Sequence, residues 1–319
     1  MKSRANSLVA ILIPCLNEEL TIRRVINSFR SALPDAQVVV VDNASGDGTA
    51  DVARACGATV LREGRRGKGN AVRRAFREVD ASIYVLVDGD DTYPAERVHD
   101  LIAPVRAGDA DVVVGTRLDV EGSEFKRLNR LGNHLLLKAV NTVFASRITD
   151  LLSGYRVMTR EFVRQVPVLS TGFEVETELS ILALERGFRT VEIPVRLGAR
   201  PPGSKSKIRL WSDGLRILKE ILTLFRDYRP LAFFGAVGVF FLLAGLAPGL
   251  FVTIEFLETG AVRVPTAVLA TGLEIVGFTQ LMTGVILGAL TRRFREIDYR
   301  LDRIQEHVAP APGEPEASG

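Results

Sequence analysis

An apolar run ends in three carboxylates in the stretch Ile83-Tyr84-Val85-Leu86-Val87-Asp88-Gly89-Asp90-Asp91-Thr92-Tyr93-Pro94. The run predicts a strand that is buried on both faces, so the acids emerge at its carboxyl end, where open α/β sheets bind ligands. Asp88 and Asp90 flank a glycine, which lets two hard oxygen ligands converge on Mg²⁺ or Mn²⁺ while the metal keeps positions for phosphate oxygens. A merely solvated turn could carry the same acids, but the preceding strand favours a metal site.

Apolar strands alternate with helical patterns from Leu8 to about Pro194. This alternation predicts an α/β domain with a mainly parallel sheet. Polar loops follow the first three strands and begin near Pro14, Asp42 and Gly64. Because the carboxyl ends of parallel strands meet at one edge, we expect these loops to lie beside the acidic turn.

The polar loops carry groups that suit a nucleoside diphosphate. Asp42 and Asn43 could bond to the edge of a nucleobase or to ribose hydroxyls. Lys68 lies between glycines at a predicted helix start, where a cation and exposed backbone N–H groups suit a diphosphate. Each group alone could belong to a capping turn or a solvated loop. Together with the acidic turn they predict one nucleotide-diphosphate pocket.

Two long apolar segments, Leu231–Ile254 and Val264–Leu290, occupy the last third of the chain. Each exceeds the roughly 20 residues that cross a hydrocarbon layer, and a buried soluble hairpin would be expected to carry more charge. Their Gly and Ala content suits close helix contact in a bilayer, and would also allow a homo-oligomer through the transmembrane helices. The flanking arginines are Arg226, Arg229, Arg292, Arg293 and Arg295. They predict that the catalytic domain and both termini are cytoplasmic.

The overall composition excludes two classes of protein. The formal net charge is only +3, which gives no footprint for nucleic acid. The two cysteines, Cys15 and Cys56, lie in apolar elements without metal-ligand spacing and are expected to be reduced core thiols. A nucleic-acid-binding protein and a disulfide-stabilised secreted domain are therefore disfavoured.

Four ordered motifs resemble family 2 glycosyltransferases with the GT-A fold. They are Ile13-Pro14-Cys15-Leu16-Asn17-Glu18, Val41-Asp42-Asn43-Ala44-Ser45-Gly46-Asp47-Gly48-Thr49, Gly67-Lys68-Gly69-Asn70-Ala71 and Asp88-Gly89-Asp90. Leu152-Ser153-Gly154-Tyr155-Arg156, Gly203-Ser204-Lys205-Ser206-Lys207 and the two terminal spans resemble the polyprenyl (dolichyl) phosphate mannose or glucose synthase group. The resemblance implies inverting transfer of a hexose from a UDP- or GDP-sugar to a polyprenyl phosphate.

The resemblance also implies roles for residues on the donor side. The nucleotide contacts would be Pro14, Leu16, Asn17, Glu18, Asp42, Asn43, Lys68, Asp88 and Gly89. Asp88 and Asp90 match the metal-binding pair and, with Arg117, would be the catalytic residues. The mannose synthases usually have Gln where this chain has Thr92, which changes the surroundings of the metal.

Cations on later segments predict an acceptor side. A strand ends in Arg117 and a helix begins near Arg130, and planar guanidinium groups match phosphate oxygens. Lys126 or Arg127 could take the place of Arg130. By resemblance, the acceptor and diphosphate contacts are Arg117, Arg130, Arg200, Ser206 and Lys207, and the sugar contacts are Asp150, Ser153 and Glu176.

We therefore expect four segments. They are a GT-A domain with its acceptor loop (1–207), an amphipathic interface helix (208–229), two transmembrane helices (230–291), and a cytoplasmic helix with a disordered tail (292–319). No catalytic base is required, because the acceptor phosphate is already anionic. One alternative is a family 2 transferase that acts on a glycolipid or polysaccharide, although the Gln-x-x-Arg-Trp motif of processive synthases is absent. Another alternative is a non-catalytic nucleotide-sugar-binding scaffold.

Overall fold

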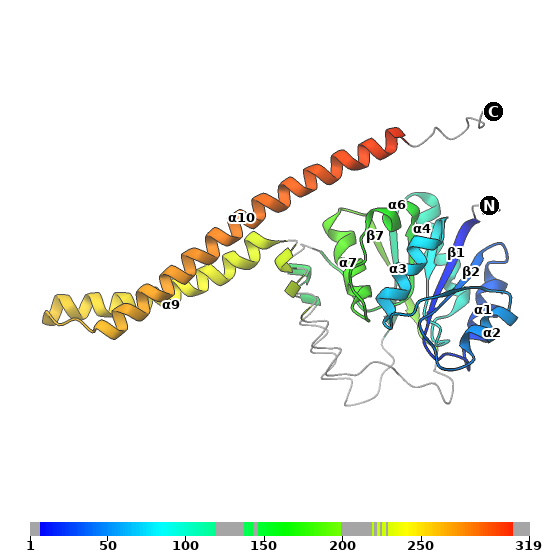
Figure 1. Cartoon of the computed structure of the whole chain (residues 1–319), viewed down its shortest axis with the longest axis horizontal. Coiled ribbons are helices and arrows are strands. Elements are labelled where there is room, and N and C mark those ends of the chain that lie inside the picture. Colours follow the sequence, from blue (N-terminus) through cyan, green and yellow to red (C-terminus); the bar gives the residue numbers. More distant parts are fainter. Residues whose placement is uncertain are drawn as a thin grey trace. The chain divides into compact units, whose positions relative to one another are not determined.

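The computed structural model describes residues 7–118, 137–138, 140–142, 146–198, 219, 222–223, 225–227 and 229–308. The chain divides into two compact units, Met1–Ile221 and Leu222–Gly319. Figure 1 labels several elements of each unit. Most of the predicted interface helix 208–229 lies outside the described residues.

The first unit contains a seven-stranded sheet of order β3-β2-β1-β4-β6-β5-β7. The strands are β1 (Ser7–Cys15), β2 (Gln37–Asp42), β3 (Thr59–Arg62), β4 (Ala81–Leu86), β5 (Val112–Leu118), β6 (Arg156–Thr159) and β7 (Thr190–Arg196). β1 to β4 pair in parallel, as do β5 and β7, whereas β6 runs antiparallel to both β4 and β5. The predicted α/β class with a mainly parallel sheet is confirmed.

Strand register brings the predicted loops to one edge of the sheet. Cys15 pairs with Asp42, and Asp42 pairs with Arg62, so β1, β2 and β3 end side by side. Leu12 pairs with Leu86, which brings the end of β4 to the same edge. The acidic turn therefore follows a strand that lies next to β1.

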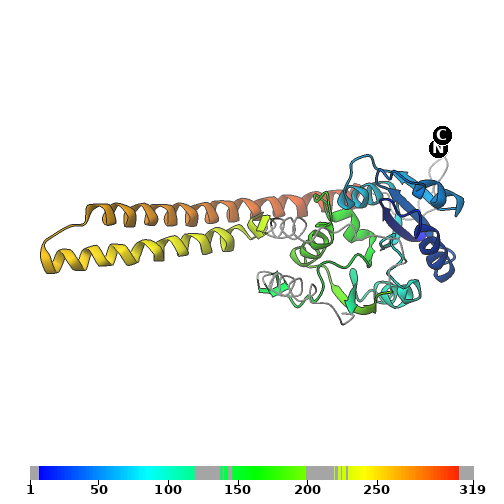
Figure 2. The ribbon, with the colours of Figure 1, turned by 90° about the horizontal axis from the view of Figure 1, so that it is seen from below.

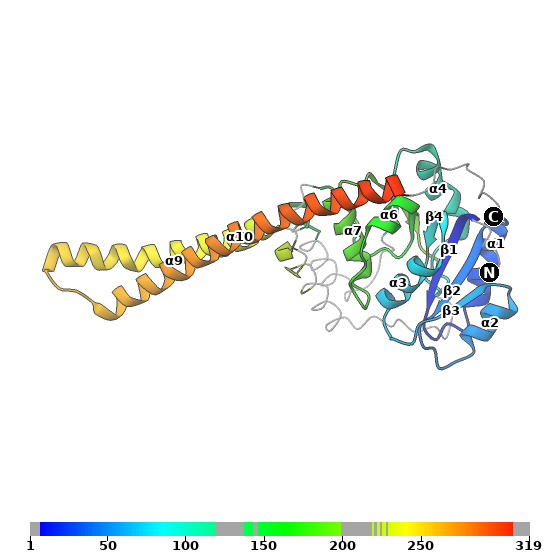
Figure 3. The same cartoon turned by 45° about the horizontal axis from the view of Figure 1, so that its top comes forward.

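Helices cover both faces of this sheet. They are α1 (Ile22–Ala32), α2 (Thr49–Ala55), α3 (Lys68–Glu78), the 3₁₀ turn η1 (Ala95–Arg97), α4 (Val98–Ala107), α6 (Arg160–Gln165) and α7 (Val175–Glu185). Apolar residues of α1 recur at helical spacing and are buried with Ile11 and Ile13 of β1. Figure 3 shows α1 and α2 on one side of the sheet and α3, α6 and α7 on the other.

The sequence predicts this helix only from Ala71, after the Gly67-Lys68-Gly69 segment, whereas α3 begins at Lys68. Gly67 has a φ of 126°, a conformation that favours glycine, and it supplies the break before the helix. Lys68 is therefore the first residue of α3 and is held by the helix backbone, not by a free loop.

The second unit consists of two helices, α9 (Pro230–Thr259) and α10 (Val264–Val308), which run side by side in Figure 2. Glycines let them approach closely: a Cβ on Gly238 would lie 2.8 Å from Leu281 Cγ. The segment 255–263, expected as a short loop between the two apolar segments, is helical up to Thr259, where α9 ends, and Gly260 follows with a φ of 70°. The polar helix expected after Arg293 is the continuation of α10.

Both helices are long and apolar enough to cross a membrane. Their most apolar stretches have mean hydropathies of 2.3 and 1.6, yet only 17% and 11% of those stretches is buried within the protein. Large side chains such as Phe240, Leu243 and Leu257 are exposed. The core helix of a water-soluble protein would bury such residues, so these helices need an apolar environment or partner.

Candidate active site

The acidic turn after β4 is fixed by the start of α1. Thr21 Oγ1 donates a hydrogen bond of 2.6 Å to the Gly89 carbonyl. Gly89 leaves no room for a side chain, because a Cβ would lie 2.6 Å from Cys15 Sγ. Asp91, at a φ of 62°, is paired with Arg24 at 3.3 Å. These contacts set the turn so that Asp88 stays partly exposed while Asp90 is buried.

Thr92 orients the buried Asp90. Its hydroxyl donates to Asp90 Oδ1 at 2.6 Å, and its backbone N–H donates to the same oxygen at 3.3 Å. This is the position at which the sequence differs from the mannose synthases that it resembles. The shorter Thr92 side chain acts here by holding one Asp90 oxygen in place.

Lys68 joins two carboxylates that are far apart in the sequence. Its ammonium donates to Asp88 Oδ1 and to Glu176 Oε1, and the side chains of Lys68 and Glu176 are only 9% and 5% exposed. Burial alone would lower the pKa of Lys68, but the two carboxylates raise it above its ordinary value, so the ammonium stays charged. Burial raises the pKa of Glu176, and Lys68 only partly opposes this shift. Glu176 Oε2 is buried without a hydrogen-bond partner in the described part of the chain.

The residues predicted for the nucleotide lie at the ends of β1 and β2. Asn17 Oδ1 accepts from Gly46 N at 2.7 Å, and Asp42 Oδ1 accepts from Ser45 N at 3.1 Å. Asn43 uses its amide within the protein, because Oδ1 accepts from Gly67 N at 2.6 Å and Nδ2 donates to Arg65 O at 2.7 Å. The predicted residues Pro14, Leu16 and Glu18 belong to the same β1 end. The structure therefore brings the predicted nucleotide residues together, and it gives Asn43 the additional task of holding the loop before α3.

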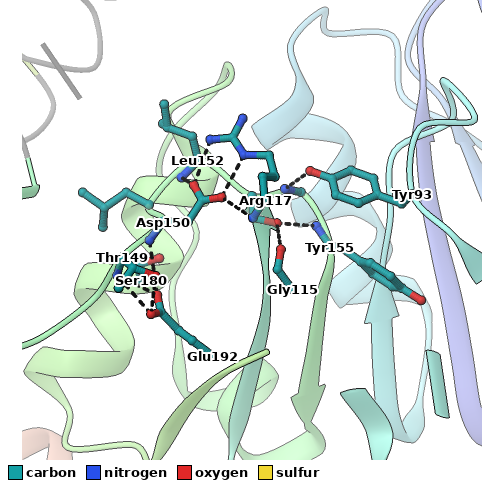
Figure 4. Close-up of polar contacts among 12 residues, drawn as sticks. Tyr93, Gly115, Arg117, Thr149, Asp150, Leu152, Tyr155, Ser180 and Glu192 are labelled. Atoms are coloured by element: carbon teal, nitrogen blue, oxygen red, sulfur yellow. Dashed lines mark hydrogen bonds and ion pairs between the residues drawn. The ribbon is translucent and has the colours of Figure 1, made fainter. Parts of the chain in front are cut away.

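Arg117 and Asp150 form a bidentate ion pair (Figure 4). Arg117 Nε lies 2.8 Å from Oδ2, Nη2 lies 2.8 Å from Oδ1, and the Arg117 backbone N–H donates to Oδ2 at 3.0 Å. Leu152 N donates to Oδ1 at 2.9 Å. Burial alone would raise the pKa of Asp150, but the bonds from Arg117 outweigh burial and hold that pKa below its ordinary value. Both Asp150 oxygens are thus engaged, which suits orientation of Arg117 better than direct contact with a sugar.

The turn from Asp150 to Arg156 connects this pair to the acidic turn. Ser153 Oγ donates to Gly115 O at 2.5 Å, and Gly154 N donates to the Tyr93 hydroxyl at 2.9 Å. A Cβ on Gly154 would lie 2.6 Å from Asp88 Oδ2. Burial raises the pKa of Tyr93 to about 12, so its hydroxyl stays protonated at neutral pH.

Arg156, the last residue of the Leu152–Arg156 motif, supports the site in a way that the motif alone does not indicate. It is fully buried, and its guanidinium donates to Ser153 O at 3.0 Å, Leu151 O at 3.2 Å and Ser180 Oγ at 2.9 Å. These bonds fasten the turn to α7, the helix that carries Glu176. A charged residue inside the apolar run Tyr155-Arg156-Val157-Met158 was the available signal, since a buried cation needs such partners.

The carboxylates of Asp88 and Asp90 suit a hard divalent cation whose remaining ligands come from outside the chain. Asp88 and Asp90 supply carboxylate oxygens, which Mg²⁺ and Mn²⁺ prefer. Among the described residues no group of three or more His, Cys, Asp and Glu side chains is placed to hold a metal. A metal at this pair would therefore keep positions for phosphate oxygens or water. The predicted contacts Arg130, Arg200, Ser206 and Lys207 lie outside the described residues.

Comparisons with known proteins agree with the motifs. Residues 10–166 match the model of Glycosyl transferase family 2. The chain is 33% identical over 299 residues to Glycosyltransferase AglJ of Haloferax volcanii, covering 93% of this chain and 98% of that protein. It is 31% identical over 216 residues to the Dolichyl-phosphate hexose transferase of the same organism, covering 67% of this chain and 92% of that protein.

A solved structure shares the fold of the first unit. Glucosyl-3-phosphoglycerate synthase from Mycobacterium tuberculosis, in complex with Mn²⁺ and UDP-glucose, superposes with a TM-score of 0.57 at 26% identity. The match covers 69% of this chain and 78% of that protein. With a relative that is matched over nearly its whole length and a family model that spans the acidic turn, the chain belongs to glycosyl transferase family 2.

Proposed function

We propose that this chain transfers a hexose from a nucleoside diphosphate sugar to a polyprenyl phosphate in a lipid bilayer. The observation that carries the proposal is the presence, in one chain, of a carboxylate and cation site and of two exposed apolar helices long enough to span a membrane. The relative named as a dolichyl-phosphate hexose transferase supports the lipid acceptor. The Mn²⁺ and UDP-glucose complex of the solved neighbour supports the donor and the metal.

On the donor side, the ends of β1 and β2 would hold the nucleoside. Pro14, Leu16, Asn17, Glu18 and Asp42 are the proposed contacts, and Asn43 positions the loop that leads to Lys68. Asp88 and Asp90, with the Gly89 backbone between them, would hold Mg²⁺ or Mn²⁺. When bound, the metal supplies positive charge that stabilises the leaving diphosphate.

In the proposed reaction, an oxygen of the acceptor phosphate attacks the anomeric carbon of the sugar. The bond from that carbon to the donor diphosphate breaks, the electron pair leaves with the diphosphate, and the configuration inverts. The acceptor phosphate is anionic at neutral pH, so no side chain has to remove a proton. The task of the protein is to position the two anions and to offset their charge.

Arg117 is the proposed contact with the acceptor phosphate. Asp150 holds its guanidinium through Nε and Nη2, which leaves Nη1 outside the ion pair. Arg130, Arg200, Ser206 and Lys207 would extend this acceptor side. Glu176 Oε2, which is buried and unpartnered among the described residues, is the proposed acceptor of a hydrogen bond from a sugar hydroxyl. Ser153, in the turn from Asp150 to Arg156, is a second proposed sugar contact.

In the proposed topology, α9 and α10 span the bilayer and residues 208–229 lie at its surface. The arginines before α9 and after the apolar part of α10 favour a cytoplasmic catalytic domain with both termini on the same side. Such an arrangement supplies the lipid phosphate at the membrane face where nucleotide sugars are available.

The test is product analysis with the full chain in lipid nanodiscs. A panel of UDP- and GDP-hexoses would be combined with polyprenyl phosphate, 3-phosphoglycerate or a glycolipid, and products would be identified by mass spectrometry. We expect a polyprenyl-phosphate hexose from one donor. A product with only 3-phosphoglycerate or only the glycolipid would overturn the lipid-phosphate acceptor. Donor binding without any product would favour the non-catalytic scaffold.

A further inference from the structure

The ammonium of Lys68 bonds to Asp88, a carboxylate that the proposed function assigns to the metal. We infer that Lys68 competes with the divalent cation for Asp88, so that the metal alone binds weakly and binds tightly only together with a nucleoside diphosphate. The inference rests on the proposed function for the identity of the metal ligands. Beyond that function, it states that tight metal binding depends on the diphosphate and that Lys68 causes this dependence.

The first step is that the Lys68 backbone cannot withdraw from the site. Gly67 N donates to Asn43 Oδ1 at 2.6 Å, and Gly69 N donates to Gly172 O at 3.1 Å. A Cβ on Gly69 would lie 2.1 Å from Ser170 O, so the two backbones are in close contact. The start of α3 is therefore anchored on both sides, and only the flexible stem of Lys68 can move the ammonium.

The second step concerns charge. The ammonium is buried between Asp88 and Glu176, where water screens its charge poorly. A divalent cation that binds Asp88 would meet this positive charge at short range, so the two cations would compete for the same carboxylate. Glu176 Oε1 can keep the ammonium when Asp88 releases it, because it already accepts one of its hydrogen bonds.

The third step is the arrival of the diphosphate. Its oxygens offer the displaced ammonium a new anionic partner, next to the N-terminus of the 11-residue helix α3. The repulsion between metal and ammonium is then replaced by attraction of both to the same anion. Because coupling between two ligands is reciprocal, the metal should tighten diphosphate binding by the same factor.

The experiment measures Mn²⁺ binding to the full chain in detergent by electron paramagnetic resonance, first alone and then with UDP or GDP. Wild-type protein should bind Mn²⁺ about tenfold more tightly when the matching diphosphate is present, the factor that one neighbouring charge typically changes. Lys68→Met should bind Mn²⁺ alone about tenfold more tightly than wild type and should lose most of the coupling.

Two further variants keep the inference testable if Lys68→Met fails to fold. Glu176→Gln removes the negative charge of the second partner of Lys68 but keeps an acceptor oxygen, so the ammonium should be drawn more strongly to Asp88 and Mn²⁺ alone should bind more weakly than to wild type. Arg74→Gln is the matched control. Arg74 is a cation of the same helix, but it pairs with Glu78 at 3.5 Å and not with Asp88. Its Mn²⁺ affinity should equal that of wild type.

The outcomes separate this inference from the proposed function. If wild type binds Mn²⁺ with a diphosphate but Lys68→Met binds Mn²⁺ alone no more tightly than wild type, the competition is overturned and the proposed metal site stands. If Arg74→Gln behaves like Lys68→Met, the effect is general charge and the assignment to Lys68 fails. If wild type binds no Mn²⁺ with or without diphosphate, the proposed metal site itself is wrong.

Discussion

The two cation–carboxylate contacts of the site differ in how completely they are satisfied. Arg117 meets Asp150 through two parallel bonds of 2.8 Å, and two backbone N–H groups complete the carboxylate. Lys68 instead divides one ammonium between Asp88 and Glu176, while Glu176 Oε2 is buried without a partner among the described residues. The Arg117–Asp150 contact matches one cation with one carboxylate and fixes the guanidinium. The Lys68 contact has two carboxylates for one cation.

This difference indicates which half of the site is ready before ligands arrive. A bidentate pair in a partly buried position holds its geometry at little entropic cost when a phosphate binds. The Lys68 cluster has two carboxylates, Asp88 and Glu176, for one ammonium, so its carboxylates outnumber its cation. It therefore has to gain a cation or exchange partners during binding. Removing members of the two contacts should have different consequences.

The largest effect is expected from Asp88→Asn. This change removes a proposed metal ligand and one partner of Lys68 at the same time, so turnover should fall by about 10³-fold or more. Sugar transfer would be measured by product mass spectrometry with saturating donor. Asp35→Asn, on an exposed loop, is the control and should retain wild-type turnover. Substantial transfer by Asp88→Asn would remove the acidic turn from the mechanism.

Arg117→Lys should have the next largest effect. Lysine keeps the charge but loses the fork that bonds to Asp150 and to a phosphate, so kcat/KM for the lipid acceptor should fall by about 100-fold. Binding of the nucleotide sugar, measured by calorimetry, should change by less than about twofold if the contact serves only the acceptor. An equal loss of donor affinity would show that the two halves of the site are not separate.

Gly154→Ala tests the junction between the two contacts. The added Cβ would lie 2.6 Å from Asp88 Oδ2 and would push that carboxylate away, so turnover should fall by about tenfold through misplacement of the site. Gly64→Ala is the matched control, because a Cβ there meets nothing within 4 Å. Thermal midpoints of both variants would be compared by circular dichroism. Loss of folding without loss of specific activity would assign Gly154 to stability alone.

The sequence predicts the central strands and the loops at their ends because these features are local. Runs such as Val38-Val39-Val40-Val41 can only be buried, and a polar loop after each run must emerge at the sheet edge. The antiparallel β6 was missed because its four residues begin with a charge, and the burial of Arg156 depends on partners from the turn and from α7.

The contacts within the site could not be predicted for a different reason. Lys68 and Glu176 are 108 positions apart, and α7 begins with three acids at alternate positions. The structure separates them: Glu178 accepts from Leu169 N and Ser170 N, Glu174 accepts from Gly172 N, and Glu176 alone bonds to Lys68. No local pattern distinguishes these roles, because each depends on which segment packs against the helix.

The smallest expected effect is on the pH dependence of stability that comes from the Arg117–Asp150 pair. The bonds from Arg117 hold the pKa of Asp150 below its ordinary value, so the unfolded chain binds a proton at this residue more readily than the folded chain. The stabilisation is therefore fully present above the unfolded pKa of about 3.9 and is lost as the pH falls through the lower, folded value. Asp150→Asn should cost about 2 kcal/mol at pH 7, and this difference from wild type should shrink below about pH 4.

Thermal unfolding of both proteins at several pH values between neutrality and about pH 3 would measure that difference. Asp111→Asn is the comparison, because Arg189 also lowers the pKa of Asp111 but lies exposed on the surface. Its effect should be smaller and should decrease with added salt, whereas the Asp150 effect should persist. A difference between wild type and Asp150→Asn that stays constant down to pH 3 would mean that ionised Asp150 does not hold Arg117 in solution, and the contrast between the two contacts would then disappear.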